Sequence, residues 1–220
     1  MAEELELRNG ERVWVRPIEP EDADGLRLAF QELSEQSRYQ RFFTGTPRLT
    51  DVMVEVLIHV DHVDREALVA VPTASSRTPV GVIRFARDPI ASQRADLAVT
   101  VADAWHGRGL ATALLHRLSA RACQLGIEYF TVDMLADNAS VRSLVRAAGG
   151  VQQGLEGGIV SAHIPLSRAE HGHTDVSSLL RASALGVVGP IPRDVAEREP
   201  SLPVTSAVLL PGAKALAGLA

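Results

Sequence analysis

The most informative stretch of the chain reads Val99-Thr-Val-Ala-Asp-Ala-Trp-His106-Gly107-Arg108-Gly109-Leu110-Ala111-Thr112. A strand-like run ends here, two glycines permit a tight turn, and a helical pattern begins at once. Glycines let the backbone approach an anion closely, and the free N–H groups and dipole of a helix N-terminus favour negative charge. Arg108 adds planar donors that suit phosphate oxygens. The stretch therefore predicts a pyrophosphate-binding loop, and an ordinary connecting loop is the alternative.

Two other phosphate-binding patterns are excluded at this loop. No Gly-Lys-Ser/Thr follows the glycines, so the stretch is not a P-loop. Thr112 stands where the dinucleotide fingerprint Gly-x-Gly-x-x-Gly requires its third glycine. The loop belongs to another class of phosphate site.

Hydrophobic periodicity around the loop predicts a mixed α/β sheet. The clearest helix is 109–125, because Leu110, Leu114, Leu118 and Ala122 recur on one face. The segment 50–59 is ambiguous, since its valines alternate as in a strand, and we interpret it as a helix that starts at Thr50. The remaining segments are strands at 11–18, 67–71, 80–87, 95–101, 127–134, 151–153 and 159–165, and helices after Pro20 and Asn138. This order predicts helices on both faces of the sheet.

The composition divides the chain near residue 167. All the aromatic residues lie between Trp14 and Phe130, and prolines are frequent after residue 168. A segment without aromatic side chains builds a core poorly. We therefore expect a folded domain at 1–167 and a tail of low order at 168–220, with a short helix near 176–185.

Charge and hydropathy exclude several classes of partner. The net charge of −5 argues against a nucleic-acid-binding protein. No apolar run approaches the roughly 20 residues that span a bilayer, and the start lacks the pattern of a signal peptide. Cys123 is the single cysteine, which excludes a disulfide framework. We expect a cytoplasmic protein with no membrane or nucleic-acid partner.

Two motifs resemble those of the GNAT superfamily of N-acetyltransferases. His106-Gly-Arg-Gly-Leu-Ala111 resembles motif A, which binds the pyrophosphate of acetyl-CoA, and 138–150 resembles motif B, in which an Asn begins the last helix. The similarity covers about residues 8–167. Within the superfamily, 13–22 and Ser37–Phe43 are similar to segments of bacterial protein-lysine acetyltransferases.

The resemblance implies a mostly antiparallel GNAT sheet and acetyl-CoA as cosubstrate, with no metal. It implies that a β-bulge near Val99 turns a backbone N–H toward the thioester. Asn138 is expected either to reach the pantetheine arm or only to cap its helix. The expected cofactor-binding residues are Val99, Val101, His106, Gly107, Arg108, Gly109, Leu110, Ala111, Thr112 and Asn138.

Three positions depart from the family pattern. His106 replaces a common Gln and remains a possible donor. Val145 stands where the family often has a Tyr that acts as general acid, and Gly150 stands where it has a Phe. Val145 has no proton to transfer, so an acid at that position is excluded.

Asp96 is the expected catalytic base. It is the carboxylate on the strand that leads into the loop, and it matches the Glu of the Ala-Glu-Phe-Ala-Val pattern in protein acetyltransferases. A lysine acceptor arrives protonated and must lose a proton before attack, directly or through water. The alternative is a solvated charge at the end of a strand, and Asp61 or Asp64 would then be the next candidates for the base.

Two further clusters of polar residues have structural explanations. His171 and His173, with Asp175 nearby, could suggest a metal site, but the pair lacks a clear third ligand. Asp61 and its neighbours 59–64 are interpreted as a turn with aspartate caps.

The function predicted is transfer of an acetyl group from acetyl-CoA to an amine, either a protein lysine or a small amine. The alternative is a non-catalytic acyl-CoA-binding module, and the sequence leaves the oligomeric state open.

Overall fold

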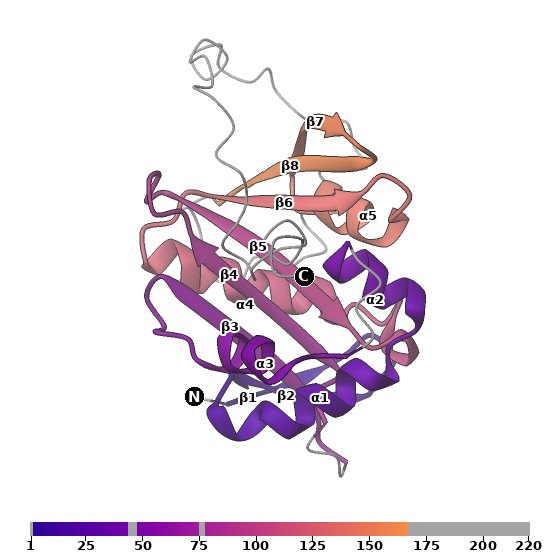
Figure 1. Ribbon diagram of the computed structural model, residues 1–220. Coiled ribbons are helices and arrows are strands. Elements are labelled where there is room, and N and C mark those ends of the chain that lie inside the picture. The colour runs from indigo at the N-terminus through magenta and orange to yellow at the C-terminus, as the bar shows by residue number, and fades with distance from the viewer. Residues whose placement is uncertain (1, 44–47, 75–77, 167–220) are drawn as a thin grey trace. The chain divides into compact units, whose positions relative to one another are not determined.

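The computed structural model describes residues 2–43, 48–74 and 78–166. These residues form an eight-stranded sheet in the order β1-β2-β3-β4-β5-β6-β8-β7 (Figure 1). The strands are β1 (Glu3–Glu6), β2 (Arg12–Pro17), β3 (Arg65–Pro72), β4 (Gly81–Arg87), β5 (Arg94–Val101), β6 (Tyr129–Leu135), β7 (Val151–Glu156) and β8 (Ile159–Pro165). The helices are α1 (Ala23–Glu32), α2 (Glu35–Phe42), α3 (Asp51–Ile58), α4 (Leu110–Gln124) and α5 (Ala139–Ala147).

All neighbouring strands pair antiparallel except β5 and β6, which run parallel. The connection between these two strands passes through α4, as a parallel pair requires. The predicted mixed and mostly antiparallel sheet is confirmed.

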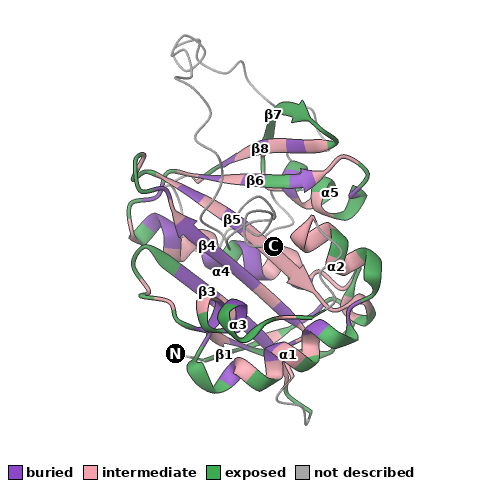
Figure 2. Ribbon diagram, in the orientation of Figure 1, coloured by how far each residue is buried: buried purple, intermediate pink, exposed green. Residues whose placement is uncertain are grey.

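Two apolar cores lie on opposite faces of the sheet (Figure 2). On one face, Leu110, Leu114 and Leu118 of α4 pack with Phe85 and Phe130, which are fully buried. On the other face, α1 and α3 cover β3 through a second cluster of buried residues. That cluster contains Ile18, Leu26, Val54, Leu57, Ile58, Ala67 and Val69. Alternate residues of one strand thus serve different cores, which fixes the register of the sheet.

The ambiguous segment 50–59 is a helix, as predicted. Thr50 caps it by accepting a hydrogen bond from the backbone N–H of Met53. The buried side chains are Met53, Val54, Leu57 and Ile58, which follow helical spacing, whereas Val52 is 71% exposed. Burial on one helical face therefore decides against the strand-like alternation of the valines.

Two elements were not predicted. The strand β1 consists of Glu-Glu-Leu-Glu, and only Leu5 offers an apolar signal. The helix α2 has no buried residue, so it shows no apolar stripe, although Ser34 caps it by accepting from the N–H of Ser37. The predicted tail at 168–220, with its helix near 176–185, lies outside the described residues.

Candidate active site

The predicted phosphate loop has the geometry of an anion site. Gly107 and Gly109 have φ of +74° and +85°, a region that favours glycine. Gly109 is the N-cap of α4 and supplies no side-chain cap. The N–H of Ala113 bonds to Gly109, whereas no described residue accepts from the N–H groups of 110–112. Free donors and the helix dipole therefore point out of the start of α4.

Arg108 is held at this loop by two neighbours. Its guanidinium forms an ion pair with Glu11 from the turn between β1 and β2, and lies 4.8 Å from the ring centroid of Trp105. Trp105 also packs against the core beneath α4. Glu11 partly neutralises Arg108, so an anion bound here must compete with this carboxylate.

His106 connects the loop back to β5. Its Nε2 lies 2.9 Å from the carbonyl oxygen of Val101. A carbonyl oxygen only accepts, so this contact places a proton on Nε2 of the exposed imidazole. The ring therefore fixes the loop against the end of the strand.

The parallel strands β5 and β6 separate on the way to the loop. They pair only from Arg94–Asp96 to Tyr129–Thr131, although β5 continues to Val101 and β6 to Leu135. The carboxyl ends of these strands lead into α4 and toward α5 (Figure 1). Ligands of open α/β sheets bind at such a point, where connections leave neighbouring strands. We call this region the β5–β6 fork.

The predicted bulge near Val99 is wrong. Pairing between β4 and β5 runs without a register shift from Gly81↔Val101 to Arg87↔Ala95. A bulge needs an extra residue in one strand, and the continuous register has none.

The backbone of Val99 and Val101 nevertheless faces the fork. The N–H of Ala102 donates to Val80 and the carbonyl of Arg94 accepts from Asp88, so the even-numbered residues of β5 bond toward β4. Backbone groups alternate along a strand, and those of Val99 and Val101 therefore point toward β6. Pairing with β6 has ended by Asp96 and the carbonyl of Val101 accepts from His106, so the backbone groups of Val99 and the N–H of Val101 are available to a ligand.

Asp96 lies where the two strands begin to separate. Its Oδ1 accepts a hydrogen bond from the hydroxyl of Thr131, which is directly opposite on β6. Burial raises the pKa of Asp96 above its ordinary value, the bond from Thr131 opposes this, and the nearby Asp133 adds to the increase. A half-buried carboxylate of raised pKa is suited to accept a proton at neutral pH.

A row of polar side chains beside Asp96 was missed by the sequence analysis. Thr131 lies between Asp96 on β5 and His163 on β8 in the register of the sheet. Burial lowers the pKa of His163, and Arg94 lowers it further. The ring of Tyr129 packs on His163 at 5.2 Å between centroids. The signal was present in the predicted strand 127–134, where the polar positions 129, 131 and 133 alternate with Phe130 and Val132.

Asn138 caps α5, which is one of its two predicted roles. Its Oδ1 accepts from the backbone N–H of Val141 at 3.1 Å, and the residue is 5% exposed. The side-chain oxygen is therefore in use, and only the amide N–H₂ is left to donate to a ligand. The cofactor role remains a prediction.

The two departures in motif B are coupled by packing. Val145 is buried in the core against β8. A Cβ added at Gly150 would lie 2.4 Å from Cγ1 of Val145 and 2.7 Å from its carbonyl oxygen. Val145 and Gly150 thus fit each other, and position 145 contributes packing where relatives place an acid.

The turn before β3 is structural, as interpreted. Asp61 accepts from the backbone N–H groups of Val63, Asp64 and Arg65. Asp64 forms an ion pair with Arg87. Burial acts to raise the pKa of Asp61, but the hydrogen bonds from three backbone N–H groups outweigh it and the pKa is lowered, which makes Asp61 a weaker candidate for the base than Asp96.

No group of three or more metal-ligating side chains occurs within the described ranges. Across the same ranges, every helix is too short or too polar to cross a bilayer. His171, His173 and Asp175 lie outside the described residues.

Comparison with known proteins shows the family. A family model described as an acetyltransferase (GNAT) domain matches residues 12–151. Acetyltransferase Pat from Mycolicibacterium smegmatis is 29% identical over 161 residues, which are 73% of this chain and 47% of that protein. Acetyltransferase PA5475 from Pseudomonas aeruginosa is 31% identical over 149 residues, which are 67% of this chain and 79% of that protein.

The solved structures agree with this result. The crystal structure of the GNAT domain of S. lividans PAT matches with a TM-score of 0.70 and 32% identity, covering 75% of this chain and 97% of that one. The chain spans about half the length of the Pat protein from M. smegmatis. The resemblance found in the two motifs is confirmed, and the chain belongs to the acetyltransferase (GNAT) domain family.

Proposed function

We propose that this chain transfers the acetyl group of acetyl-CoA to an amine, and that the amine is a protein lysine. The observation that carries the proposal is the β5–β6 fork, with Asp96 where the strands meet and the free N–H groups of 110–112 where β5 leads into α4. The lysine acceptor is supported by the similarity of 13–22 and Ser37–Phe43 to bacterial protein-lysine acetyltransferases. An anion site and a base thus lie at opposite ends of one strand.

The loop fits the pyrophosphate of acetyl-CoA. Its glycines present no Cβ, and no described group occupies the N–H donors at the start of α4. In this proposal Gly107, Gly109, Leu110 and Ala111 hold the pyrophosphate through their N–H groups. Arg108, His106 and Thr112 assist, with Arg108 exchanging Glu11 for phosphate oxygens.

The fork positions the reacting groups. Acetyl-CoA supplies an activated thioester, and the backbone groups of Val99 and the N–H of Val101 are available along the path from the loop to Asp96. A backbone N–H at Val99 would stabilise the negative charge that develops on the thioester oxygen. The continuous strand supplies this donor without a bulge.

Asp96 accepts the proton that the amine must lose. A lysine amine has a pKa near 10.4 and is protonated at neutral pH. Asp96 takes this proton through a water molecule, because its side chain is one methylene shorter than Glu. The neutral amine then forms the C–N bond, its nitrogen loses a second proton to solvent and the C–S bond breaks. The CoA thiolate takes a proton from solvent because Val145 has none to give.

Release of free CoA distinguishes this proposal from a non-catalytic acyl-CoA-binding module. The purified chain is incubated with acetyl-CoA and a panel of lysine-containing proteins and small amines. The proposal predicts acceptor-dependent CoA release and acetylated lysines by mass spectrometry. Binding of acetyl-CoA with no transfer to any acceptor would support the binding module instead.

A further inference from the structure

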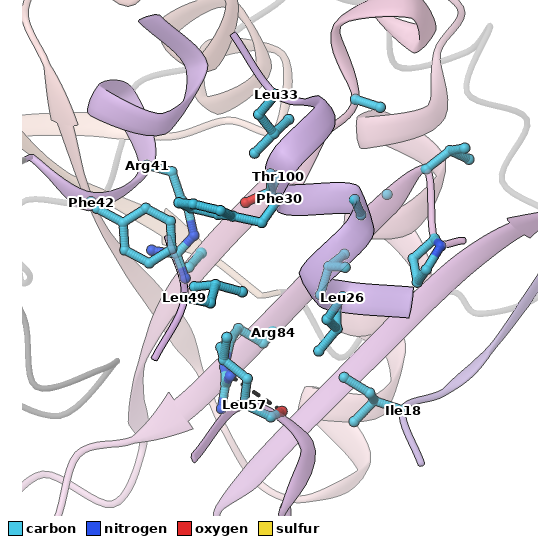
Figure 3. Close-up of a pocket in the computed structure, with 17 residues that line it drawn as sticks. Ile18, Leu26, Phe30, Leu33, Arg41, Phe42, Leu49, Leu57, Arg84 and Thr100 are labelled. Carbon is cyan, nitrogen blue, oxygen red and sulfur yellow. Dashed lines mark hydrogen bonds between the residues drawn. The ribbon is translucent and has the colours of Figure 1, made fainter. Parts of the chain in front are cut away.

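A cavity lies between the sheet and residues of α1, α2 and α3 (Figure 3). Its volume of about 70 Å³ is several times the roughly 10–15 Å³ that admits one water molecule. Its walls are mostly apolar, with Leu26 and Phe30 from α1, Leu33 directly after α1, and Leu57 from α3. Among the described lining residues, the side chains that carry polar groups are Arg41, Arg84 and Thr100.

The two arginines reach the cavity from different elements. Arg84 is on β4 and is 2% exposed, and Arg41 is on α2 beside Phe42, with its guanidinium carbon 5.0 Å from the ring centroid. Burial lowers the pKa of each guanidinium to about 10, and Arg41 and Arg65 contribute to the decrease at Arg84. Like charges are thus held together in an apolar setting.

These guanidinium groups lack a counter-charge within the described structure. No acidic residue is among the described residues that line the cavity. Nε of Arg84 is buried and has no hydrogen-bond partner among the described residues. A buried charge without a partner is costly, and natural proteins usually pair such groups.

Arg84 also has a structural contact, which is too weak to account for the site. Its two terminal nitrogens lie 3.4 Å from the carbonyl oxygens of Val56 and Leu57, near the C-terminus of α3. A cation at a helix C-terminus is favourable. The contacts are nevertheless long for hydrogen bonds, they leave Nε unused, and they do not explain Arg41.

The cavity adjoins the proposed catalytic carboxylate. Ala98 and Thr100 line it and share a face of β5 with Asp96, because alternate residues of a strand face the same way. Arg84 pairs with Ala98 in the register of the sheet. Its Cα is therefore one strand across and two residues along from Asp96, about 8 Å away by ordinary strand spacings.

We propose that this cavity binds the carboxylate of an acceptor whose carbon chain is apolar, with Arg41 and Arg84 as its counter-charges. The inference rests on the proposed function in one respect, namely that the acceptor's amine reacts beside Asp96. A carboxylate satisfies the free donor of Arg84 and both positive charges, while the apolar chain fills the rest of the cavity. The acceptor is then a protein lysine in a segment that also presents a carboxylate, and a small amine with a carboxylate at its far end is the minimal analogue of these two groups.

Binding is tested first without any reaction. Hexanoate and its neutral isostere hexanamide are titrated into the full chain by calorimetry. The proposal predicts that hexanoate binds at least tenfold more tightly, because charge-assisted bonds to guanidinium groups are lost in the amide. Equal affinities for the two probes, or no binding of hexanoate, would overturn it.

Three variants assign the preference to the cavity. Arg41→Gln and Arg84→Gln should each reduce the preference for hexanoate at least fivefold, while Arg27→Gln, a partly exposed arginine of α1 outside the cavity, should retain it. A thermal melt checks that each variant folds. If Arg84→Gln does not fold, Arg41→Gln decides alone, and an unchanged preference in that variant contradicts the proposal.

A further experiment measures turnover, and it is the part of the test that depends on the proposed function. With acetyl-CoA, 6-aminohexanoate should have a kcat/KM at least tenfold above that of 6-aminohexanamide, mainly through KM. Equal values for the two amines would overturn the carboxylate site while leaving acetyl transfer intact. Hexanoate binding without turnover of any amine would instead refute the proposed function and keep the anion site.

Discussion

At the proposed pyrophosphate site, the carboxylate of Glu11 competes with the ligand for Arg108. The ion pair between them must open before Arg108 can contact a phosphate. This contact could not be foreseen from the sequence, because the two residues are far apart in the chain and meet through the turn between β1 and β2. Motif A identifies the loop, whereas the fold determines how much positive charge the loop offers.

We expect Arg108→Ala to weaken acetyl-CoA binding at least tenfold, since each charge-assisted bond contributes roughly 1.5–3 kcal/mol. Gly109→Val should weaken it further, because φ of +85° strains a branched residue and its side chain would approach Arg8. Glu11→Gln should have the opposite effect and tighten binding. Calorimetric titration measures all three, and unchanged affinity in both Arg108→Ala and Gly109→Val would remove the loop assignment.

Asp96 should oppose folding when it is ionised. Its pKa is raised in the folded protein above the unfolded value near 3.9, so stability is lost as pH rises through the folded pKa. Asp96→Asn removes this loss and retains an acceptor for Thr131. Its Tm should exceed that of the wild type at neutral pH, and the difference should shrink as pH falls toward about 4.

Thermal melts of both proteins across this pH range test the assignment. Asp137→Asn, which removes an exposed carboxylate, is the control and should change Tm little. A lower Tm for Asp96→Asn at neutral pH would show that the ionised carboxylate stabilises the fold, contrary to this prediction.

At the scale of elements, hydrophobic periodicity predicts the helices and strands that bury apolar side chains, and it misses those that bury few. The helix α4 was predicted almost to its ends because its leucines face one core. The elements β1 and α2 were missed, since β1 has one apolar residue and α2 buries none. The polar row of Thr131 and His163 was missed because it forms only when β5, β6 and β8 align.

The two roles of Asn138 at the start of α5 can be separated by substitution. Asn138→Asp keeps the oxygen that caps Val141 and loses the amide donor, so stability should persist while acetyl-CoA binds several-fold more weakly. Asn138→Ala loses the cap as well and should cost about 0.5–2 kcal/mol of stability. Denaturant unfolding and calorimetry report the two effects, and unchanged affinity in Asn138→Asp would leave Asn138 as a cap alone.

For the whole molecule, the described sheet and its two cores form one unit, and β8 is the last of its strands along the chain. The last described strand ends at Pro165, and the family model ends at residue 151. We propose that residues 1–167 are the acetyltransferase domain. A protein truncated before Arg168 should retain a cooperative melt and bind acetyl-CoA with the affinity of the full chain. Failure of the truncated chain to fold would place residues after 167 in the core.

The central claim is that Asp96 at the β5–β6 fork acts as the base for acetyl transfer from acetyl-CoA bound at the loop. The most direct measurement is the steady-state rate at which Asp96→Asn acetylates an amine acceptor, with the affinity for acetyl-CoA measured on the same preparation. We predict a loss of about 10²-fold or more in turnover with nearly unchanged acetyl-CoA affinity, and a wild-type rate that rises with pH as Asp96 ionises. Full turnover by Asp96→Asn across that pH range would contradict the account.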